Sequence, residues 1–417
     1  MRLHIQHGHV IDPANGVDRF ADVCIAQGMI VSVGAVPEGF VADRVLDASS
    51  MLVLPGLVDL SARVDQSGDA FGAALAGGVT SLVQPPQASA IPAALMSRQR
   101  GPQAKVYPLG ALTVALKGQA LTEMVGLTEA GCVGFSQGNT PVKDTAVLLR
   151  AMQYAKSFDY AVWLQPQDAW LSRGGVVASG AYASRLGLAA ISVEAETIAL
   201  QTLLSLQRAT GVNMHLCRLS SAEAIEWVRA AKKAGQSITC DVAANQVHLT
   251  DIDIGYYESH FRLDPPLRGQ RDRDAIRLGL LDGTIDAVCS DHTPLMDLDK
   301  TFPFADAVPG AMGLELLLSL TLKWAQEARV PLSEALKRVT CGPGRVLAKS
   351  AKWSVQPGCL AVGAPADVCV VDPEHYWLVS REHILGKSDH TPFLGREVPG
   401  RVYATVMQGQ VVWERQP

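Results

Sequence analysis

The chain has 417 residues, of which 48% are hydrophobic and 18% are charged, and its formal net charge is −5. This length accommodates a barrel with a small accessory domain, and the hydrophobic fraction is sufficient for a large core. The negative charge argues against nucleic-acid binding and against a polybasic contact with a membrane surface.

The N-terminal residues 1–7 include polar side chains where a secretory signal would need an apolar core. The apolar stretch at 313–320 contains a charge and is too short to span a bilayer. The eight cysteines form no C-x-x-C pair, which is typical of reduced thiols. These features predict a cytoplasmic protein that makes no contact with a membrane.

Short strands separated by turns are expected at both ends of the chain. Alternating apolar residues and the breakers Pro13, Gly16, Gly28 and Pro37 favour strands over helices in the first fifty residues. The predicted strands are 3–6, 8–11, 22–26, 29–33 and 44–47, and the same pattern returns at 366–372 and 401–414. We therefore expect residues 1–54 and 356–417 to form one small β-sandwich domain.

The middle of the chain alternates between strand-like and helix-like segments. Strands are predicted at 79–84, 105–109, 131–136, 161–165, 213–219, 237–243 and 285–290. Helices are predicted at 144–156, 193–210, 222–234, 271–281 and 332–338. Repeated units of this length imply a parallel sheet, and about eight of them imply a closed barrel. The predicted fold class is therefore α/β, with a (β/α)8 TIM-type barrel over residues 55–355.

Several motifs in this region occur in the order found in one known family. Residues 54–60 read Leu-Pro-Gly-Leu-Val-Asp-Leu, residues 77–83 read Gly-Gly-Val-Thr-Ser-Leu-Val, and residues 265–268 read Pro-Pro-Leu-Arg. The longest motif, at 282–294, reads Asp-Gly-Thr-Ile-Asp-Ala-Val-Cys-Ser-Asp-His-Thr-Pro. Over nearly its whole length the chain resembles the dihydroorotases of the amidohydrolase superfamily, which implies the same barrel with a β domain.

Dihydroorotases interconvert carbamoyl aspartate and dihydroorotate with one or two zinc ions, and the resemblance identifies the positions of the metal ligands. The family's His-x-His after the first barrel strand is replaced by Ser61 and Arg63. An arginine has donors and no acceptor lone pair, so it cannot coordinate zinc. The other ligand positions carry Gln137, Arg218 and Asn245, and of the ligands only Asp291 remains, followed by His292.

The positions that would contact substrate are also changed. Asp65 stands where the family has an arginine for the substrate carboxylate. Two asparagines of the family correspond to Gln87 and Asp264, and a histidine corresponds to Leu295. Since a catalytic zinc needs about three protein ligands, the resemblance implies a site with no metal, no cofactor and no working catalytic residue, in which Asp291 is vestigial.

One hypothesis concerns the charge of this altered site. A buried carboxylate without a partner is costly, and Arg63 and Arg218 replace the positive charge of the metal. We expect both guanidinium groups to pair with Asp291.

These substitutions predict a pseudoenzyme related to dihydroorotase. Inactive chains of this kind accompany aspartate carbamoyltransferase in some bacteria, so the resemblance implies a non-catalytic, structural subunit in de novo pyrimidine biosynthesis. The expected partner is the catalytic subunit of aspartate carbamoyltransferase in a hetero-oligomer, and a homo-oligomer stays open.

Two alternatives remain. The first is an active amidohydrolase, a dihydroorotase or a related cyclic amide hydrolase, with an altered or reduced metal site and Asp291 as the base. The second is a small-molecule sensor, in which Arg63 and Arg218 bind an anion in the remodelled pocket.

Overall fold

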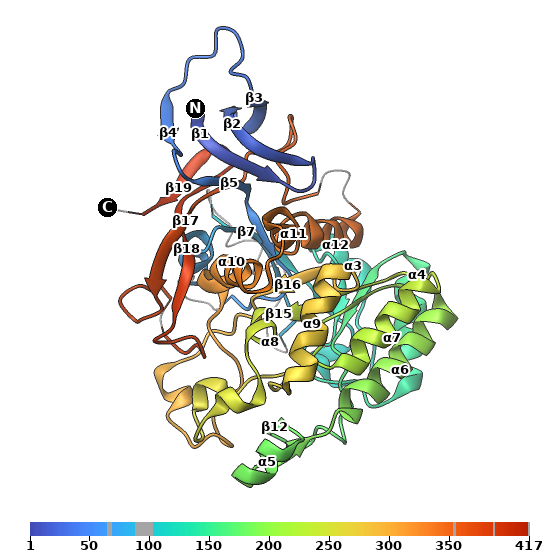
Figure 1. Cartoon of the computed structure of the whole chain (residues 1–417). Coiled ribbons are helices and arrows are strands. Elements are labelled where there is room, and N and C mark those ends of the chain that lie inside the picture. The colour runs from blue at the N-terminus through green and yellow to red at the C-terminus, as the bar shows by residue number, and fades with distance from the viewer. Residues whose placement is uncertain (65–68, 88–102, 353–355, 387, 416–417) are drawn as a thin grey trace.

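The computed structural model describes residues 1–64, 69–87, 103–352, 356–386 and 388–415. Both ends of the chain lie in one β-sheet, and the middle of the chain forms a barrel surrounded by helices (Figure 1). No helix within the described part of the chain combines the length and the apolar character needed to cross a membrane.

The terminal sheet has eight strands. They are β1 (Arg2–Asp12), β2 (Val17–Ala26), β3 (Met29–Gly34), β4 (Arg44–Asp47), β5 (Leu52–Pro55), β17 (Val368–Leu378), β18 (Glu397–Met407) and β19 (Gln410–Glu414). The order is β19-β18-β17-β5-β1-β2-β3, with β4 paired to the first half of β1. The antiparallel pairing of β17 with β5 joins the two chain ends, as the sequence predicted.

Eight strand positions form the barrel, and all pair in parallel. They are β6 (Leu57–Asp59), β7 (Val79–Gln84), β8 (Lys105–Pro108) continued by β9 (Gly110–Ala111), β10 (Phe135–Ser136), β11 (Ala161–Leu164), β14 (Asn213–Leu216), β15 (Ile238–Ala243) and β16 (Ala287–Cys289). A parallel bridge between Ala62 and His292 connects the ends of β6 and β16 and closes the ring. The predicted barrel with a β domain is confirmed.

Helices cover the outside of the barrel (Figure 1). They are α1 (Asp69–Ala76), α3 (Met124–Glu129), α4 (Thr145–Ser157), α6 (Glu194–Thr210), α7 (Ala222–Lys233), α9 (Gln270–Asp282), α10 (Leu317–Ala328), α11 (Leu332–Lys337) and α12 (Cys341–Ala351). Their starts follow from local sequence: the Asp144 carboxylate accepts the backbone N–H groups of Ala146 and Val147, and the Ser221 hydroxyl accepts that of Ala224.

Shorter elements occupy the loops. They are α5 (Ala181–Leu186), α8 (Ala244–His248), β12 (Val177–Ala178), β13 (Ala190–Ile191) and the 3-10 turns η1 (Val114–Leu116), η2 (Asp251–Ile254), η3 (Ser259–Phe261), η4 (Asp297–Lys300) and η5 (Leu314–Leu316).

One predicted strand is much shorter than expected. The segment 131–136 contributes only Phe135–Ser136 to the barrel. Gly131 has a φ of 99°, and Cys132 donates its N–H to the Leu127 carbonyl, so this part of the chain completes the turn after α3. The apolar composition of the segment reflects burial rather than strand pairing.

The barrel and the terminal sheet share one hydrophobic core. Leu54, Val371 and Val402 of the sheet belong to the same buried cluster as Leu57 and Leu317 of the barrel. The helix α10 lies against β18, and the hydroxyl of Ser319 donates to the Gly400 carbonyl. The sheet is therefore packed against the barrel through a continuous core.

Candidate functional site

The carboxyl ends of the barrel strands bring five predicted positions to one mouth. Ser61 follows β6, Gln137 follows β10, Arg218 follows β14, Asn245 lies in α8 directly after β15, and Asp291 follows β16. Parallel strands of a barrel end on the same face, so side chains just beyond them converge there. All five side chains are buried.

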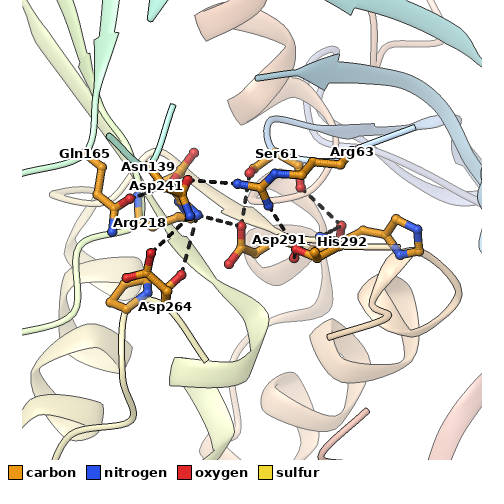
Figure 2. A network of polar contacts seen from close by, with 12 residues as sticks. Ser61, Arg63, Asn139, Gln165, Arg218, Asp241, Asp264, Asp291 and His292 are labelled. Carbon is orange, nitrogen blue, oxygen red and sulfur yellow. Dashed lines mark hydrogen bonds and ion pairs between the residues drawn. The ribbon is translucent and has the colours of Figure 1, made fainter. Parts of the chain in front are cut away.

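An ion pair between Arg218 and Asp291 lies at the centre of the mouth (Figure 2). The Arg218 Nη1 atom is 3.0 Å from Asp291 Oδ1, and Nη2 donates to Asn139 Oδ1 at 2.7 Å and to Gln165 Oε1 at 2.5 Å. Burial opposes ionisation of Arg218, but Asp291 and Asp264 outweigh it and raise its pKa. Half of the charge hypothesis is therefore confirmed, because Arg218 pairs with Asp291.

Arg63 makes different bonds, and for this residue the hypothesis was wrong. Its Nη1 atom donates to the Thr293 hydroxyl at 2.9 Å and its Nη2 atom to Asn139 Oδ1 at 2.8 Å. Its charge still acts on Asp291, although burial lowers the pKa of Arg63. The Asn139 Oδ1 atom accepts from both guanidinium groups and so bridges Arg63 and Arg218.

The carboxyl group of Asp291 is buried, and the charges of Arg218 and Arg63 act on it. Burial raises the pKa of its carboxyl group, and the charges of Arg218 and Arg63 counteract only part of this effect. Ser61 donates its hydroxyl to Asp291 Oδ1 at 3.2 Å. Asp291 and Arg218 both have positive φ, 49° and 54°, a backbone region that non-glycine residues rarely adopt and that often marks functional sites.

A second polar network lies one layer below the mouth. The Asp241 carboxylate accepts Arg218 N–H at 2.6 Å and is 3.0 Å from His215 Nε2, while His215 Nδ1 is 2.8 Å from the Thr239 hydroxyl. We name this set, together with Asp59 and Ser290, the lower network.

Asp59 anchors the other side of the lower network. Its carboxyl group accepts the backbone N–H groups of Ser61 and Ser290 at 3.2 and 2.9 Å, and the Ser290 hydroxyl also donates to it. Complete burial raises the pKa of Asp59 to about 7.

The remaining predicted positions contribute less to the mouth. Gln137 accepts from the Thr113 hydroxyl and donates to the Leu116 carbonyl, so it braces a loop. The Asp264 carboxylate accepts from Asn139 Nδ2 at 3.0 Å. Leu295 is buried and Gln87 is exposed. Asp65 lies outside the described residues.

Sequence reasoning missed Asn139, Gln165 and Thr293. Each of them follows the end of a barrel strand or a motif that the sequence had identified. A search for polar side chains just beyond each predicted strand would have found them, because barrel sites are built from these positions.

The residues at the mouth do not fit a zinc ion. Zinc is held by thiolate, imidazole and carboxylate groups, whereas guanidinium groups approach Asp291 from β6 and β14. Among the residues that the structure describes, no three His, Cys, Asp or Glu side chains form a group that could hold a metal. We therefore assign no chemical step to a metal.

A cavity opens above Asp291. It encloses about 720 Å³ of space, including the part open to solvent, and Arg63, Asp291, Asp264 and Thr293 are among its lining residues. Arg218 is not part of the lining. A ligand in the cavity would therefore meet the Arg63 guanidinium and the Asp291 carboxylate directly, with Arg218 behind them.

Known proteins resemble this chain over its whole length. The profile of the dihydro-orotase-like family matches residues 50–224, and that of the amidohydrolase family matches residues 178–412. A dihydroorotase-like protein of Pseudomonas aeruginosa is 38% identical over 99% of this chain and 100% of its own length. A dihydroorotase of Citrifermentans bemidjiense is 36% identical over 99% of this chain and 100% of its own length.

The fold is similar to that of a solved hydrolase. L-hydantoinase (dihydropyrimidinase) from Arthrobacter aurescens superposes with a TM-score of 0.85 over 100% of this chain and 96% of its own, at 21% identity. The expectation that the chain is not an enzyme is wrong on these comparisons, because several relatives that match from end to end are named dihydroorotase. That expectation equated the substitution of the family's metal ligands with loss of activity. A site with different side chains can still contain groups that transfer protons or stabilise charge.

Proposed function

This chain belongs to the dihydroorotase-like amidohydrolases, and from that membership we propose that it hydrolyses a small cyclic amide with its own charged side chains at the barrel mouth. The observation that carries the proposal is the cavity in which Asp291 and Arg63 face the same space. A carboxylate beside a fixed cation is a combination suited to proton transfer and to oxyanion stabilisation.

In this proposal Asp291 is the base. A raised pKa brings a carboxyl group closer to neutrality and makes it a better proton acceptor, which is what general base catalysis near pH 7 needs. Asp291 takes a proton from the attacking water, whose oxygen bonds to the amide carbon. The same proton then passes to the ring nitrogen as the C–N bond breaks, which yields a free amide or amine. The new carboxyl group loses the second proton of the water to solvent and becomes a carboxylate.

Arg63 stabilises the negative charge that develops on the carbonyl oxygen. It lines the cavity, and its bonds to Thr293 and Asn139 fix its orientation. Arg218 is a positioning residue, since its ion pair determines where the Asp291 carboxylate lies. Fixed donors of this kind contribute about 3 kcal/mol each to stabilising such a transition state.

The test is hydrolysis of dihydroorotate and hydantoin by the purified protein, with its zinc content measured in the same sample. We expect turnover that does not scale with zinc content. Asp291→Asn should lower turnover by about 10²-fold or more. The exposed carboxylate of Asp274 offers a matched control, and Asp274→Asn should leave turnover unchanged. Turnover that Asp291→Asn preserves, or no turnover on either substrate, would contradict the proposal.

We also propose that the chain associates with the catalytic subunit of aspartate carbamoyltransferase. The supporting observation is a lobe beside the mouth, the rim lobe, formed by residues 251–262 and 296–308. The Ser259 hydroxyl donates to the Lys300 carbonyl and connects its two segments. Ile252, Tyr256, Met296 and Leu298 of this lobe are each more than 60% exposed, and exposed apolar side chains that gather on one lobe are typical of an interaction site.

Co-expression with the aspartate carbamoyltransferase catalytic chain and size-exclusion chromatography test the association. We expect co-elution, which the double variant Tyr256→Ser, Leu298→Ser should weaken. Phe20 is similarly exposed on β2 of the terminal sheet, so Phe20→Ser is the matched control and should retain co-elution. Separate elution of the unmodified chains, or equal loss in the control, would rule out the rim lobe as the contact.

A further inference from the structure

A second cavity lies beside the mouth, between helices α4 and α6 and over the end of β11. It encloses about 740 Å³, including the part open to solvent. Its lining includes Asn139, Lys143, Leu148, Gln165, Trp170 and Leu203.

An indole ring and an ammonium group stand at the rim of this cavity. The Lys143 Nζ atom is 4.7 Å from the centroid of the Trp170 ring, which is 63% exposed. Within the described residues, no carboxylate pairs with Lys143. The position therefore offers an indole ring with a positive charge over one face, and no carboxylate in the described part of the chain pairs with that charge.

The acidic residues close to this pair in the chain are already engaged, and Asp144, next to Lys143, accepts the backbone N–H groups of Ala146 and Val147. Asp168 Oδ1 accepts the backbone N–H groups of Trp170 and Leu171, each at 2.9 Å. These bonds fix the turn that presents Trp170. The Asp168 carboxylate therefore positions the ring, and Lys143 remains available to an anion from solution.

Amide groups line the inner end of the cavity. Gln165 uses its Oε1 atom to accept from Arg218 Nη2, so its amide nitrogen points away from Arg218 (Figure 2). Gln167 adds a second amide to the lining, while Leu148, Leu164 and Leu203 form the apolar part. An apolar cavity with a few directed amide groups suits a flat ring that has hydrogen-bonding edges.

From these observations we propose that the cavity between α4 and α6 is a second ligand site, for a planar heterocycle that carries an anionic group. The ring stacks on Trp170 and meets the amides of Gln165 and Gln167, and the anionic group pairs with Lys143. This site is separate from the cavity above Asp291, although both are lined by Asn139 and lie one hydrogen bond from Arg218.

Uridine 5′-monophosphate is a suitable probe because it combines a single flat ring with a phosphate. Isothermal titration calorimetry of the full chain should show saturable binding of this nucleotide at one site. Uridine should bind about 5-fold more weakly, since it lacks the group that pairs with the exposed Lys143. Inorganic phosphate should show no saturable binding.

Two substitutions separate the ring contact from the charge contact. Trp170→Ala should weaken nucleotide binding about tenfold through loss of stacking. Lys143→Met should weaken nucleotide binding to the level of uridine and leave uridine binding unchanged. Lys143→Arg should retain the affinity, and Lys233→Met, at an exposed lysine on α7, is the matched control and should have no effect.

Four results would overturn the proposal. Phosphate that binds as tightly as the nucleotide would mean that only an anion is recognised. Equal weakening of nucleotide and uridine by Lys143→Met would indicate structural damage. Nucleotide affinity that Trp170→Ala leaves unchanged would mean that the ring does not stack on Trp170. The absence of saturable nucleotide binding would mean that the cavity is not a site for this class of ligand.

Discussion

The charged cluster at the mouth and the lower network beneath it are both buried and polar, yet they bond to different partners. At the mouth, Arg218 and Arg63 donate mainly to side chains. In the lower network, Asp59 and Asp241 accept the backbone N–H groups of Ser61, Ser290 and Arg218. The hydrogen bonds of the lower network therefore fix the backbone at the ends of the barrel strands. The hydrogen bonds at the mouth fix only the orientation of the charged side chains.

This difference explains how the mouth can carry residues so unlike metal ligands within an intact barrel. The backbone that presents Ser61, Arg218 and Asp291 is fixed from below, whatever side chains occupy the mouth. A substitution at the mouth should therefore change charge balance and chemistry, while a substitution below should change the stability of the barrel itself.

The largest effect is expected when the ion pair at the mouth loses its cation. Arg218→Met leaves Asp291 buried without its bonded partner and should lower the free energy of unfolding by about 3 kcal/mol. Urea denaturation measures this loss. The double variant Arg218→Met, Asp291→Asn should recover more than 1 kcal/mol of it, because the uncompensated charge is gone. A double variant less stable than Arg218→Met would show that the two residues do not act as a pair.

The lower network should respond to pH. Folding raises the pKa of Asp59 from its usual 3.8 to about 7, so the folded state retains a proton that the unfolded state has released between these values. Stability should therefore be greatest below about pH 4 for this group and should fall as the pH rises towards 7, by up to about 1.4 kcal/mol per pH unit.

Asp59→Asn tests this dependence, because an amide can accept the same two N–H groups and donate to the Ser290 hydroxyl. Chemical denaturation at several pH values should show a smaller decline in the variant than in the unmodified protein. An unchanged slope would mean that another group is responsible.

A smaller effect is expected at the point where the two networks meet. Ser61 gives its N–H to Asp59 and its hydroxyl to Asp291, so Ser61→Ala removes one buried hydrogen bond and retains the other. The expected loss of unfolding free energy is about 1 kcal/mol. Ser205→Ala, at an exposed serine on α6, should cost no more than a few tenths of that amount.

The smallest effect is expected far from both networks. Arg44 and Glu414 form a half-exposed ion pair across the terminal sheet, and such pairs contribute little because water and salt screen them. Arg44→Met should change the unfolding free energy by about 0.5 kcal/mol or less, and added salt should reduce the difference. A loss of unfolding free energy as large as that of Arg218→Met would mean that burial does not determine how much an ion pair contributes to stability in this protein.

Much of the fold could be predicted because its signals are local. Apolar alternation and turn residues identified the terminal strands, and the helix-like segments between the barrel strands identified α4, α6, α7 and α9 within one or two residues at each end. The strand at 131–136 was overestimated, because burial in the barrel and pairing in the barrel produce the same apolar pattern.

The site was predicted in position but not in bonding. Motif order placed Ser61, Arg63, Arg218 and Asp291 at one mouth, since the ends of parallel strands must converge. Arg63 donates to Thr293 rather than to Asp291, and Asn139 bridges the two arginines. Both contacts depend on the directions of the side chains, which the spacing of residues in the sequence does not encode.

The sequence by itself therefore determined the family and the barrel, because these follow from residue identity and the order of motifs, and the resemblance implied that arginines stand at two of the family's ligand positions. Only the tertiary structure decided which charges pair, which carboxylates hold backbone and which cavity each side chain faces. Those properties depend on distances of a few ångströms between strands far apart in the chain, and they turned an apparently lost site into one with Asp291 and Arg63 facing the same space.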